Sequence, residues 1–205
     1  MGGNVSLYNE TERGPIYPTP VVGMVGEVPD PTVGTVAGFE DGDLIAVVGP
    51  FRPALAGSEL AKQRGELGPG LPDIDVKAAA DAIALVREAV RDGMLRVAHD
   101  ISDGGLAVAL AECAIAGDVG LEVDLAGLIA DRGGEPEEWL FGEGPAGFVI
   151  AGDAEKIGAV TETAGGAVIG RAGGAQITIL AGQARIATTP VDAAAAWRSI
   201  SELLD

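Results

Sequence analysis

The sequence predicts an α/β protein of the α+β type, in which a mixed β-sheet is covered by helices. Short apolar runs of strand length alternate with segments whose apolar residues have helical spacing, and glycine and proline mark the joins between them. The last two strands form a hairpin. Strands that are interleaved with helices and end in a hairpin are typical of a sheet with both parallel and antiparallel neighbours.

The composition indicates a globular protein whose partners are neither nucleic acids nor anionic membranes. Apolar residues make up 47% of the 205 residues and the formal net charge is −18, so the basic surface that both partners need is missing. The single cysteine, Cys113, excludes an internal disulfide and is expected in the core. Neither a membrane span nor a secretory signal is visible, which favours a cytoplasmic location.

Residues 1–30 are expected to be the tail of an incomplete domain, and residues 31–205 to form the second domain. The first nine residues read as a polar loop with two glycines, residues 15–20 as a stiff connector with three prolines and residues 21–28 as a strand. This stretch is too short to fold alone, so the body of its domain is expected to be missing.

The elements of the second domain begin with a buried strand over residues 44–49 and a short helix near Ser58 and Glu59. Asp75 is expected to cap the clearest helix, which Gly93 closes. The apolar stripe that this helix would bury consists of Val76, Ala79, Ile83, Val86 and Val90.

The later elements alternate in the same way up to a final helix that begins at Thr189 and Pro190. Strands are predicted at residues 120–125, 148–151 and 168–169, helices at 135–141 and 157–164, and a hairpin at 176–187. The inner face of the final helix would carry Ala193, Trp197, Ile200 and Leu204.

Residues 97–110 carry the strongest local signal for chemistry. A short apolar strand ends at His99 and Asp100, and two glycines after Asp103 lead into an apolar helix. The N–H groups of a first helical turn bind phosphate when glycine lets it approach, and Asp100 would suit a metal ion that bridges to the phosphate. The alternative is structural: Asp103 caps the helix, Asp100 braces the loop and His99 is a structural residue. The side chains that this helix would bury are Leu106, Leu110 and Cys113.

Two further places offer groups that could bind a ligand. The Asn4 side-chain oxygen suits magnesium and the Ser6 hydroxyl can bond to a phosphate or sugar oxygen, whereas the alternative is a frayed terminus. Ser58 and Glu59 could face a ligand, although such a pair more commonly caps a helix. The glycine-rich turn at residues 141–147 is a weak signal by itself.

Five motifs, taken in order, resemble the C-terminal part of phosphoribosylformylglycinamidine synthase, the large synthetase subunit (subunit II type) of purine biosynthesis. The motifs read GNVSLYNE, PTPVVG, GSEL, AHDISDGGL and LFGE, at residues 3–10, 18–23, 57–60, 98–106 and 140–143. Their order is preserved over nearly the whole chain. The resemblance implies the end of an N-type domain joined to a complete C-terminal domain of the aminoimidazole ribonucleotide synthetase type.

The resemblance implies an ATP-dependent carbon–nitrogen ligase that works with Mg²⁺. In that family ATP activates the amide oxygen of formylglycinamide ribonucleotide, and ammonia then displaces phosphate to give formylglycinamidine ribonucleotide, ADP and phosphate. The implied partners are the missing N-terminal part of the synthetase, a glutaminase subunit and a small accessory subunit. Because the family's catalytic histidines lie in the missing part, the fragment is expected to be inactive alone and His99 is given no catalytic role.

Three residues of the first loop take roles from this resemblance. Gly3 matches an ATP contact, Asn4 a magnesium ligand and Ser6 a substrate contact. The family's Glu-Ser-Gln substrate motif aligns with residues 142–144, where the Ser and Gln are missing. This half of the synthetase is therefore expected to have lost the substrate role.

An auxiliary nucleotide site is the second implication. Asp100 resembles a metal-binding Asp of the family's first half, and Asp100, Ser58 and Glu59 would be the ligands of a nucleotide bound at the equivalent place. One alternative function is a non-catalytic structural and interaction domain that carries this site. Another is a different member of the superfamily, such as aminoimidazole ribonucleotide synthetase, thiamine phosphate kinase or selenophosphate synthetase.

Overall fold

The structure, a computed structural model, describes residues 10–16, 23, 25–27, 30, 32–68 and 73–199. The chain divides into two units, Met1–Pro31 and Thr32–Asp205. In the first unit β1 (Glu10–Thr11) and β2 (Gly14–Pro15) pair antiparallel in a short hairpin that the sequence pattern did not predict. A strand was predicted at residues 21–28. This prediction is wrong for the described residues of that range, 23 and 25–27, because none of them has a partner strand.

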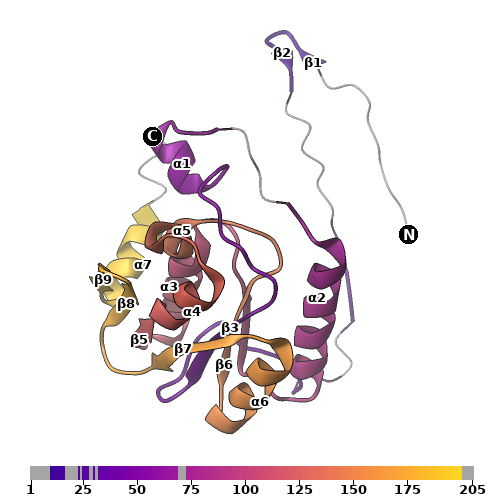
Figure 1. Cartoon of the computed structure of the whole chain (residues 1–205), viewed down its shortest axis with the longest axis vertical. Helices are drawn as coiled ribbons and strands as arrows, with labels where there is room; N and C mark the ends of the chain where they lie inside the picture. The colour runs from indigo at the N-terminus through magenta and orange to yellow at the C-terminus, as the bar shows by residue number, and fades with distance from the viewer. Residues whose placement is uncertain are drawn as a thin grey trace. The chain divides into compact units, whose positions relative to one another are not determined.

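A mixed sheet forms the centre of the second unit (Figure 1), which confirms the predicted fold class. Its strand order is β4-β6-β3-β7-β5-β8-β9, and all neighbours are antiparallel except the parallel pair β5 and β8. The strands are β3 (Leu44–Val48), β4 (Val97–Asp100), β5 (Leu121–Asp124), β6 (Phe148–Gly152), β7 (Ala167–Ala172), β8 (Ile177–Ala181) and β9 (Ala184–Thr188).

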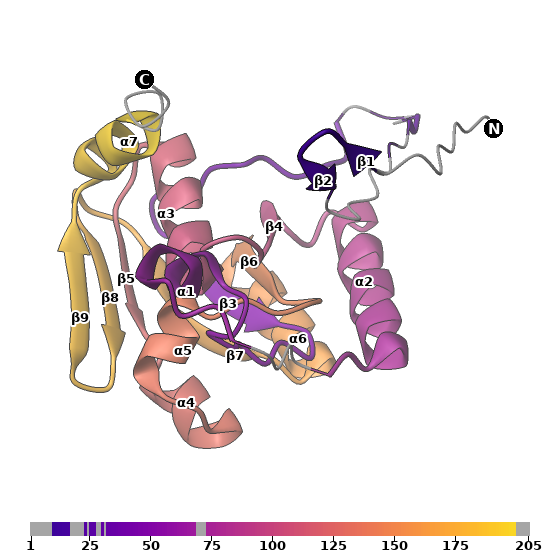
Figure 2. The same ribbon diagram turned by 90° about the horizontal axis from the view of Figure 1, so that it is seen from above.

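Helices cover both faces of this sheet (Figure 2). The helices are α1 (Glu59–Arg64), α2 (Val76–Arg91), α3 (Gly105–Gly117), α4 (Ala126–Arg132), α5 (Pro136–Phe141), α6 (Ala154–Ala164) and α7 (Pro190–Arg198). Side chains of α3, α4 and α5 join the apolar cluster on one face, and those of α2 and α6 join the cluster on the other. Among the described residues, no helix is both long and apolar enough to cross a membrane.

The strand β3 is buried on both faces and separates the two apolar clusters. Ile45 and Val47 belong to the larger cluster beneath α3, whereas Ala46 and Val48 belong to the smaller cluster beneath α2 and α6. Successive side chains of a strand point to opposite faces, so an uninterrupted apolar run can be buried on both. This confirms the buried strand predicted at residues 44–49.

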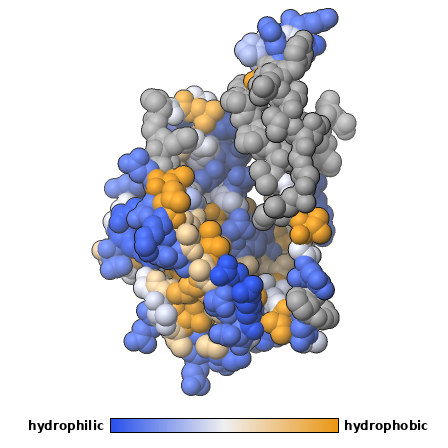
Figure 3. Space-filling view, turned by 90° about the vertical axis from the view of Figure 1, so that its right-hand side faces the viewer, coloured by the Kyte–Doolittle hydropathy of each residue, from blue (hydrophilic) through white to orange (hydrophobic). Residues whose placement is uncertain are grey.

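The helix α2 begins as predicted but buries only part of its apolar stripe. Asp75 caps it, with its Oδ1 accepting a hydrogen bond from the N–H of Ala78 at 2.9 Å. Val86 is buried, but Val76 and Ile83 are 74% and 51% exposed. The predicted burial of these two residues is wrong, because neighbouring elements cover only the part of the stripe around Val86. The side of the molecule that carries α2 accordingly shows apolar patches among hydrophilic ones (Figure 3).

The final helix, α7, shows the same kind of departure. Thr189 caps it through a bond from the N–H of Asp192, and Pro190 is its first residue, as predicted. Ala193 is half-buried, but Trp197 is 62% exposed, so its predicted inward orientation is wrong. Nothing in the described part of the chain covers the outer side of the helix at this residue. Ile200 and Leu204 lie outside the described residues.

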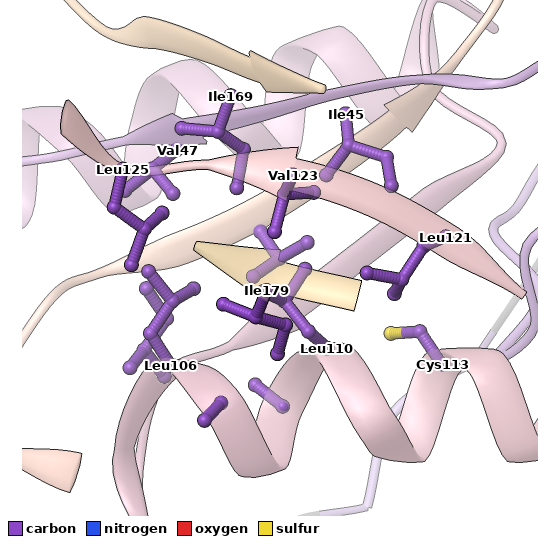
Figure 4. Packing of buried hydrophobic residues seen from close by; sticks show 14 of the residues in the cluster. Ile45, Val47, Leu106, Leu110, Cys113, Leu121, Val123, Leu125, Ile169 and Ile179 are labelled. Atoms are coloured by element: carbon purple, nitrogen blue, oxygen red, sulfur yellow. The ribbon is translucent and has the colours of Figure 1, made fainter. Parts of the chain in front are cut away.

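The helix α3 is enclosed between the sheet and two further helices. Its Leu106, Leu110 and Cys113 are fully buried and point toward the strands, as predicted (Figure 4). The helix α3 also contacts α5 and α7. Burial, with a smaller contribution from the charge of Glu112, raises the pKa of the Cys113 thiol to about 12. The cysteine is therefore an inert part of the core.

Candidate functional site

Three motifs that lie far apart in the sequence meet at the side chain of Glu143. Its Oε1 atom accepts a hydrogen bond from the backbone N–H of Glu59 at 2.8 Å and from the backbone N–H of Gly104 at 2.9 Å. Glu59 is the first residue of α1 and Gly104 precedes α3. The N–H groups at a helix start have no partner within the helix and carry partial positive charge. One carboxylate therefore satisfies the starts of two helices.

Backbone contacts hold the turn that presents Glu143. Ala54 and Glu143 exchange two backbone hydrogen bonds, of 3.0 and 2.9 Å. A Cβ atom at Gly142 would lie 2.4 Å from the carbonyl oxygen of Glu138, and one at Gly105 would lie 2.7 Å from the carbonyl oxygen of Gly142. Gly105 also has a φ of +77°. Both glycines are therefore needed for this close approach of backbone to backbone.

The helices α1 and α5 are tied together beside this turn. The Arg64 guanidinium makes two hydrogen bonds to the Glu137 carboxylate, of 2.6 Å (Nη2 to Oε1) and 3.1 Å (Nη1 to Oε2). This hydrogen-bonded pair lowers the pKa of Glu137 and raises the pKa of Arg64. Trp139 of α5 packs edge-to-face on Phe51, with ring centroids 5.9 Å apart. The motifs at residues 57–60 and 140–143 are thus fixed against each other.

Glu143 bonds to the residue that precedes the helix start at which the sequence pattern predicted a phosphate. The predicted strand, glycine turn and helix start are all present: β4 ends at Asp100, Gly104 has a φ of +82° and α3 follows. The N-cap residue of α3 is Gly104, which has no side chain, so the structural alternative in which Asp103 caps α3 is wrong. The N–H of Gly104 is instead bonded to a carboxylate of this chain. The local sequence pattern around Gly104 did not predict this role of Glu143, because the two residues are 39 positions apart in the chain.

Asp100 presents an accessible carboxylate at the end of β4, where its side chain is 68% exposed. In the described part of the chain, no group of three or more His, Cys, Asp or Glu side chains could hold a metal ion. A magnesium ion commonly uses one or two protein carboxylates and takes its remaining ligands from phosphate and water. The exposed Asp100 carboxylate fits such a role, with phosphate and water completing the ligand set.

His99 belongs to β4 and is partly buried, and its side chain reaches α3. Its Nδ1 is 2.7 Å from the carbonyl oxygen of Asp100, and its Nε2 is 3.6 Å from a carboxylate oxygen of Glu112 on α3. These contacts connect the strand to the helix that follows it. They are the contacts of a structural residue and do not place the imidazole in a catalytic group.

Ser58 and Glu59 both act on the helix that they begin. Ser58 is fully buried, and its Oγ accepts a hydrogen bond from the N–H of Ala61 at 3.2 Å. The Glu59 carboxylate pairs with Lys62 at 3.0 Å. The structure therefore places Ser58 as a helix cap, the alternative that its sequence position also allowed. The other predicted site residues, Gly3, Asn4 and Ser6, lie outside the described residues.

Comparison with known families identifies the domain built around this site. The family described as "AIR synthase related protein, C-terminal domain" matches residues 40–181, which is more than half of the chain. The chain belongs to this family. The matched range of this AIR synthase-related domain includes the Ser58–Glu59 helix start, the turn after Asp100 and Glu143.

Curated relatives of this AIR synthase-related domain confirm the resemblance drawn from the motifs. The phosphoribosylformylglycinamidine synthase subunit PurL of Moorella thermoacetica is 43% identical over 185 residues, which are 87% of this chain and 25% of that protein. The chain thus spans about a quarter of the length of the curated relatives it matches.

Solved structures support the fold of the AIR synthase-related domain. The structure of T. maritima PurL complexed with FGAR matches with a TM-score of 0.64 at 21% identity, over 79% of this chain and 29% of that one. The structure of PurLQS from Thermotoga maritima matches with a TM-score of 0.58 at 19% identity, over 77% of this chain and 26% of that one.

Proposed function

We propose that the chain is the C-terminal part of the ATP-dependent synthetase that makes formylglycinamidine ribonucleotide in purine biosynthesis. The reaction consumes formylglycinamide ribonucleotide, ATP and glutamine-derived ammonia and releases ADP and phosphate. The 43% identity to PurL of M. thermoacetica across 87% of the chain carries this proposal. The meeting of three of the shared motifs at Glu143 supports it, because the motifs form one structural unit.

In this proposal residues 1–30 are the tail of an N-type synthetase domain and residues 31–205 are the C-terminal domain. Gly3 contacts ATP, Asn4 binds Mg²⁺ and Ser6 contacts the substrate. Magnesium-bound ATP would supply the phosphoryl group that activates the amide oxygen. The chain would position these ligands at the edge of a centre whose catalytic residues lie in the rest of the synthetase, and alone it is inactive.

The partners follow from the same reading. They are the N-terminal part of the synthetase, a glutaminase subunit that supplies ammonia and a small accessory subunit, all in the cytoplasm. The chain's share of about a quarter of the length of its relatives supports the need for the first of these partners.

An auxiliary magnesium–nucleotide site is the finer part of the proposal. Of its two candidate carboxylates, that of Asp100 is the more exposed, at 68% against 47% for Glu59. The Ser58 hydroxyl is engaged in the cap of α1 and the Glu59 carboxylate in its pair with Lys62. Asp100 would therefore hold the metal, while Ser58 and Glu59 would shape the adjacent turn.

Calorimetric titration of magnesium–ADP into the chain tests this site. We expect a saturable signal that Asp100→Asn weakens about tenfold, because a charge-assisted metal contact is lost. Asp103→Asn is the matched control: it removes the same charge from an exposed position in the same turn and should leave binding unchanged. Absence of a signal, or an equal loss in both variants, would contradict the auxiliary site.

Turnover assays test the proposed reaction itself. The chain supplied with formylglycinamide ribonucleotide, ATP, Mg²⁺ and ammonium should show no activity. Addition of the separately purified remainder of a PurL relative should restore it. Turnover by the chain alone would contradict the proposal that its catalytic residues lie elsewhere, and failure of reconstitution would contradict the proposed role in the synthetase.

A second candidate function is a purely structural and interaction domain. The internal bond between Glu143 and the start of α3 favours it, because the chain itself occupies an N–H group that phosphate would otherwise use. Restored turnover in the reconstituted enzyme, together with no binding of magnesium–ADP to the chain, would select this function.

A further inference from the structure

A cavity of about 530 Å³ lies between α2, α6 and the segment that follows β3. Small-molecule sites generally have volumes of roughly 300–1,000 Å³ and mainly apolar walls with a few polar groups. The walls of this cavity include Val48, Ala82, Leu85, Val86 and Ala164, and its charged lining includes Arg52 and Arg132. The cavity thus has the size and the mixed lining of a ligand site.

Arg132 is held in the wall of this cavity by two backbone carbonyl groups. Its Nη1 donates to the carbonyl oxygen of Gly49 and its Nη2 to the carbonyl oxygen of Gly165, both at 3.1 Å. A guanidinium has five N–H groups, so these two bonds leave others for a ligand. The pKa of Arg132 is lowered, mainly because the side chain is buried. The negative charge of Asp131 opposes this shift, and the positive charge of Arg52 adds to it.

Neither Arg52 nor Arg132 has a carboxylate ion-pair partner among the described residues. Other basic side chains do form such pairs, namely Lys62, Arg64, Lys77, Arg87, Arg91 and Arg96. Two guanidinium groups that line one cavity repel each other, and a bound anion would relieve this repulsion.

Carboxylates also lie close to the cavity, among them Asp131, whose charge acts on Arg132. Asp81 lines the cavity but forms an ion pair with Lys77 on α2. Asp73 and Asp75 line an adjoining hollow that also contains Arg52, and the Oδ1 of Asp75 caps the start of α2. None of these carboxylates forms an ion pair with Arg52 or Arg132 in the described part of the chain, so both guanidinium groups keep N–H groups for an anion.

We propose that this cavity binds a small organic phosphate, with Arg52 and Arg132 holding the phosphate group and the apolar walls holding the body of the molecule. Guanidinium groups match phosphate geometry with two parallel N–H bonds, which favours phosphate over a simple point-charge contact. The cavity is separate from the turn at Asp100 and Glu143, and the proposed synthetase reaction does not use it.

Calorimetric titration of ribose 5-phosphate into the 205-residue chain tests this proposal. We expect saturable binding that Arg52→Gln weakens about tenfold to a hundredfold, because a charged hydrogen-bond donor to the phosphate is lost. Arg52 suits the test because its side chain is exposed, so its replacement should leave thermal unfolding unchanged. Arg185→Gln is the matched control, since it removes the same charge from an exposed position on β9.

A second variant tests the apolar part of the site. Ala82→Leu keeps both guanidinium groups but places a larger side chain in the cavity, so it should weaken binding of ribose 5-phosphate and spare that of inorganic phosphate. The absence of saturable binding at about 10 mM ribose 5-phosphate, which corresponds to a very weak site, would overturn the proposal. Equal weakening by Arg185→Gln, or binding of inorganic phosphate as tight as that of the ester, would also overturn it.

Discussion

The two faces of the sheet are covered in different ways. On one face α3 contacts the strands and two further helices, α5 and α7, and its Leu106 and Leu110 are fully buried. On the other face α2 is an outer layer: Val86 and Ala89 are buried, whereas Ile83 is 51% exposed. A helix with neighbours on two sides can be apolar all round, whereas an outer helix is buried along one stripe at most.

The burial that stabilises the fold and the proposed ligand cavity therefore lie on different faces of the sheet. The free energy gained from burial is concentrated on the α3 face, which has the larger apolar cluster. The α2 face has looser cover, and the cavity lined by Arg52 and Arg132 lies there, between α2 and α6. Substitutions on the two faces should therefore have very different effects on the free energy of unfolding.

The largest effect is expected at Leu110 on α3. Leu110→Ala should lower the free energy of unfolding by about 3 kcal/mol, because it removes fully buried methyl groups and leaves a cavity. Urea denaturation followed by circular dichroism would measure this change. A loss below about 1 kcal/mol, which is typical of exposed positions, would show that the α3 face is no better packed than the α2 face.

The next largest effect is expected at Glu143, which joins the start of α3 to α1. Glu143→Ala should cost about 2 kcal/mol, because two helix-start N–H groups lose their acceptor. Glu143→Gln keeps a side-chain oxygen and should cost less. Amide hydrogen exchange at Glu59 and Gly104 should accelerate in the alanine variant. Unchanged exchange at both amides would contradict the bridging role.

A smaller effect follows from the raised pKa of Cys113. The folded-state pKa is about 12 against an ordinary value of 9.0, so above pH 9 the folded chain binds a proton that the unfolded chain has lost. This contribution is therefore fully present well below pH 9 and is lost as the pH rises toward 12, by about 1.4 kcal/mol at pH 10. Cys113→Ala should lack this part of the decline in urea denaturation. An identical decline in both proteins would contradict the effect.

The smallest effect is expected at Ile83 on α2. Ile83→Ser should change the free energy of unfolding by less than about 0.5 kcal/mol, because half of the side chain is already in contact with water. The same denaturation assay, with Leu110→Ala measured beside it, sharpens the comparison of the two faces. A loss comparable to that at Leu110 would mean that α2 is covered after all.

Most of the helices and strands were predictable because the residues that indicate them lie within each element or directly before it. The apolar run of β3, the proline and acidic residues at the start of α5 and the cap of α7 each appear within a few residues. The helix α4 was missed, because its first residue follows Leu125, which offers no side-chain cap. Strand pairing was not predictable in the same way, since it joins segments far apart in the chain.

The candidate site was only partly predictable for the same reason. The turn after Asp100 and the helix start at Ser58 were singled out from their own residues. Their common partner, Glu143, was not, because its two bonds span 84 and 39 residues. The sequence also did not predict that Arg52 and Arg132 line the same cavity, since neither arginine lies in a recognisable motif.

The sequence by itself determined the type of fold, the elements and the resemblance to a synthetase, since periodicity, caps and ordered motifs are local properties of the chain. The tertiary structure alone decided which apolar stripes are covered and which groups meet. Ile83 and Leu110 have similar side chains, yet only Leu110 has neighbours on every side. Burial depends on what other parts of the chain pack against a residue, and this is fixed only when distant segments come together.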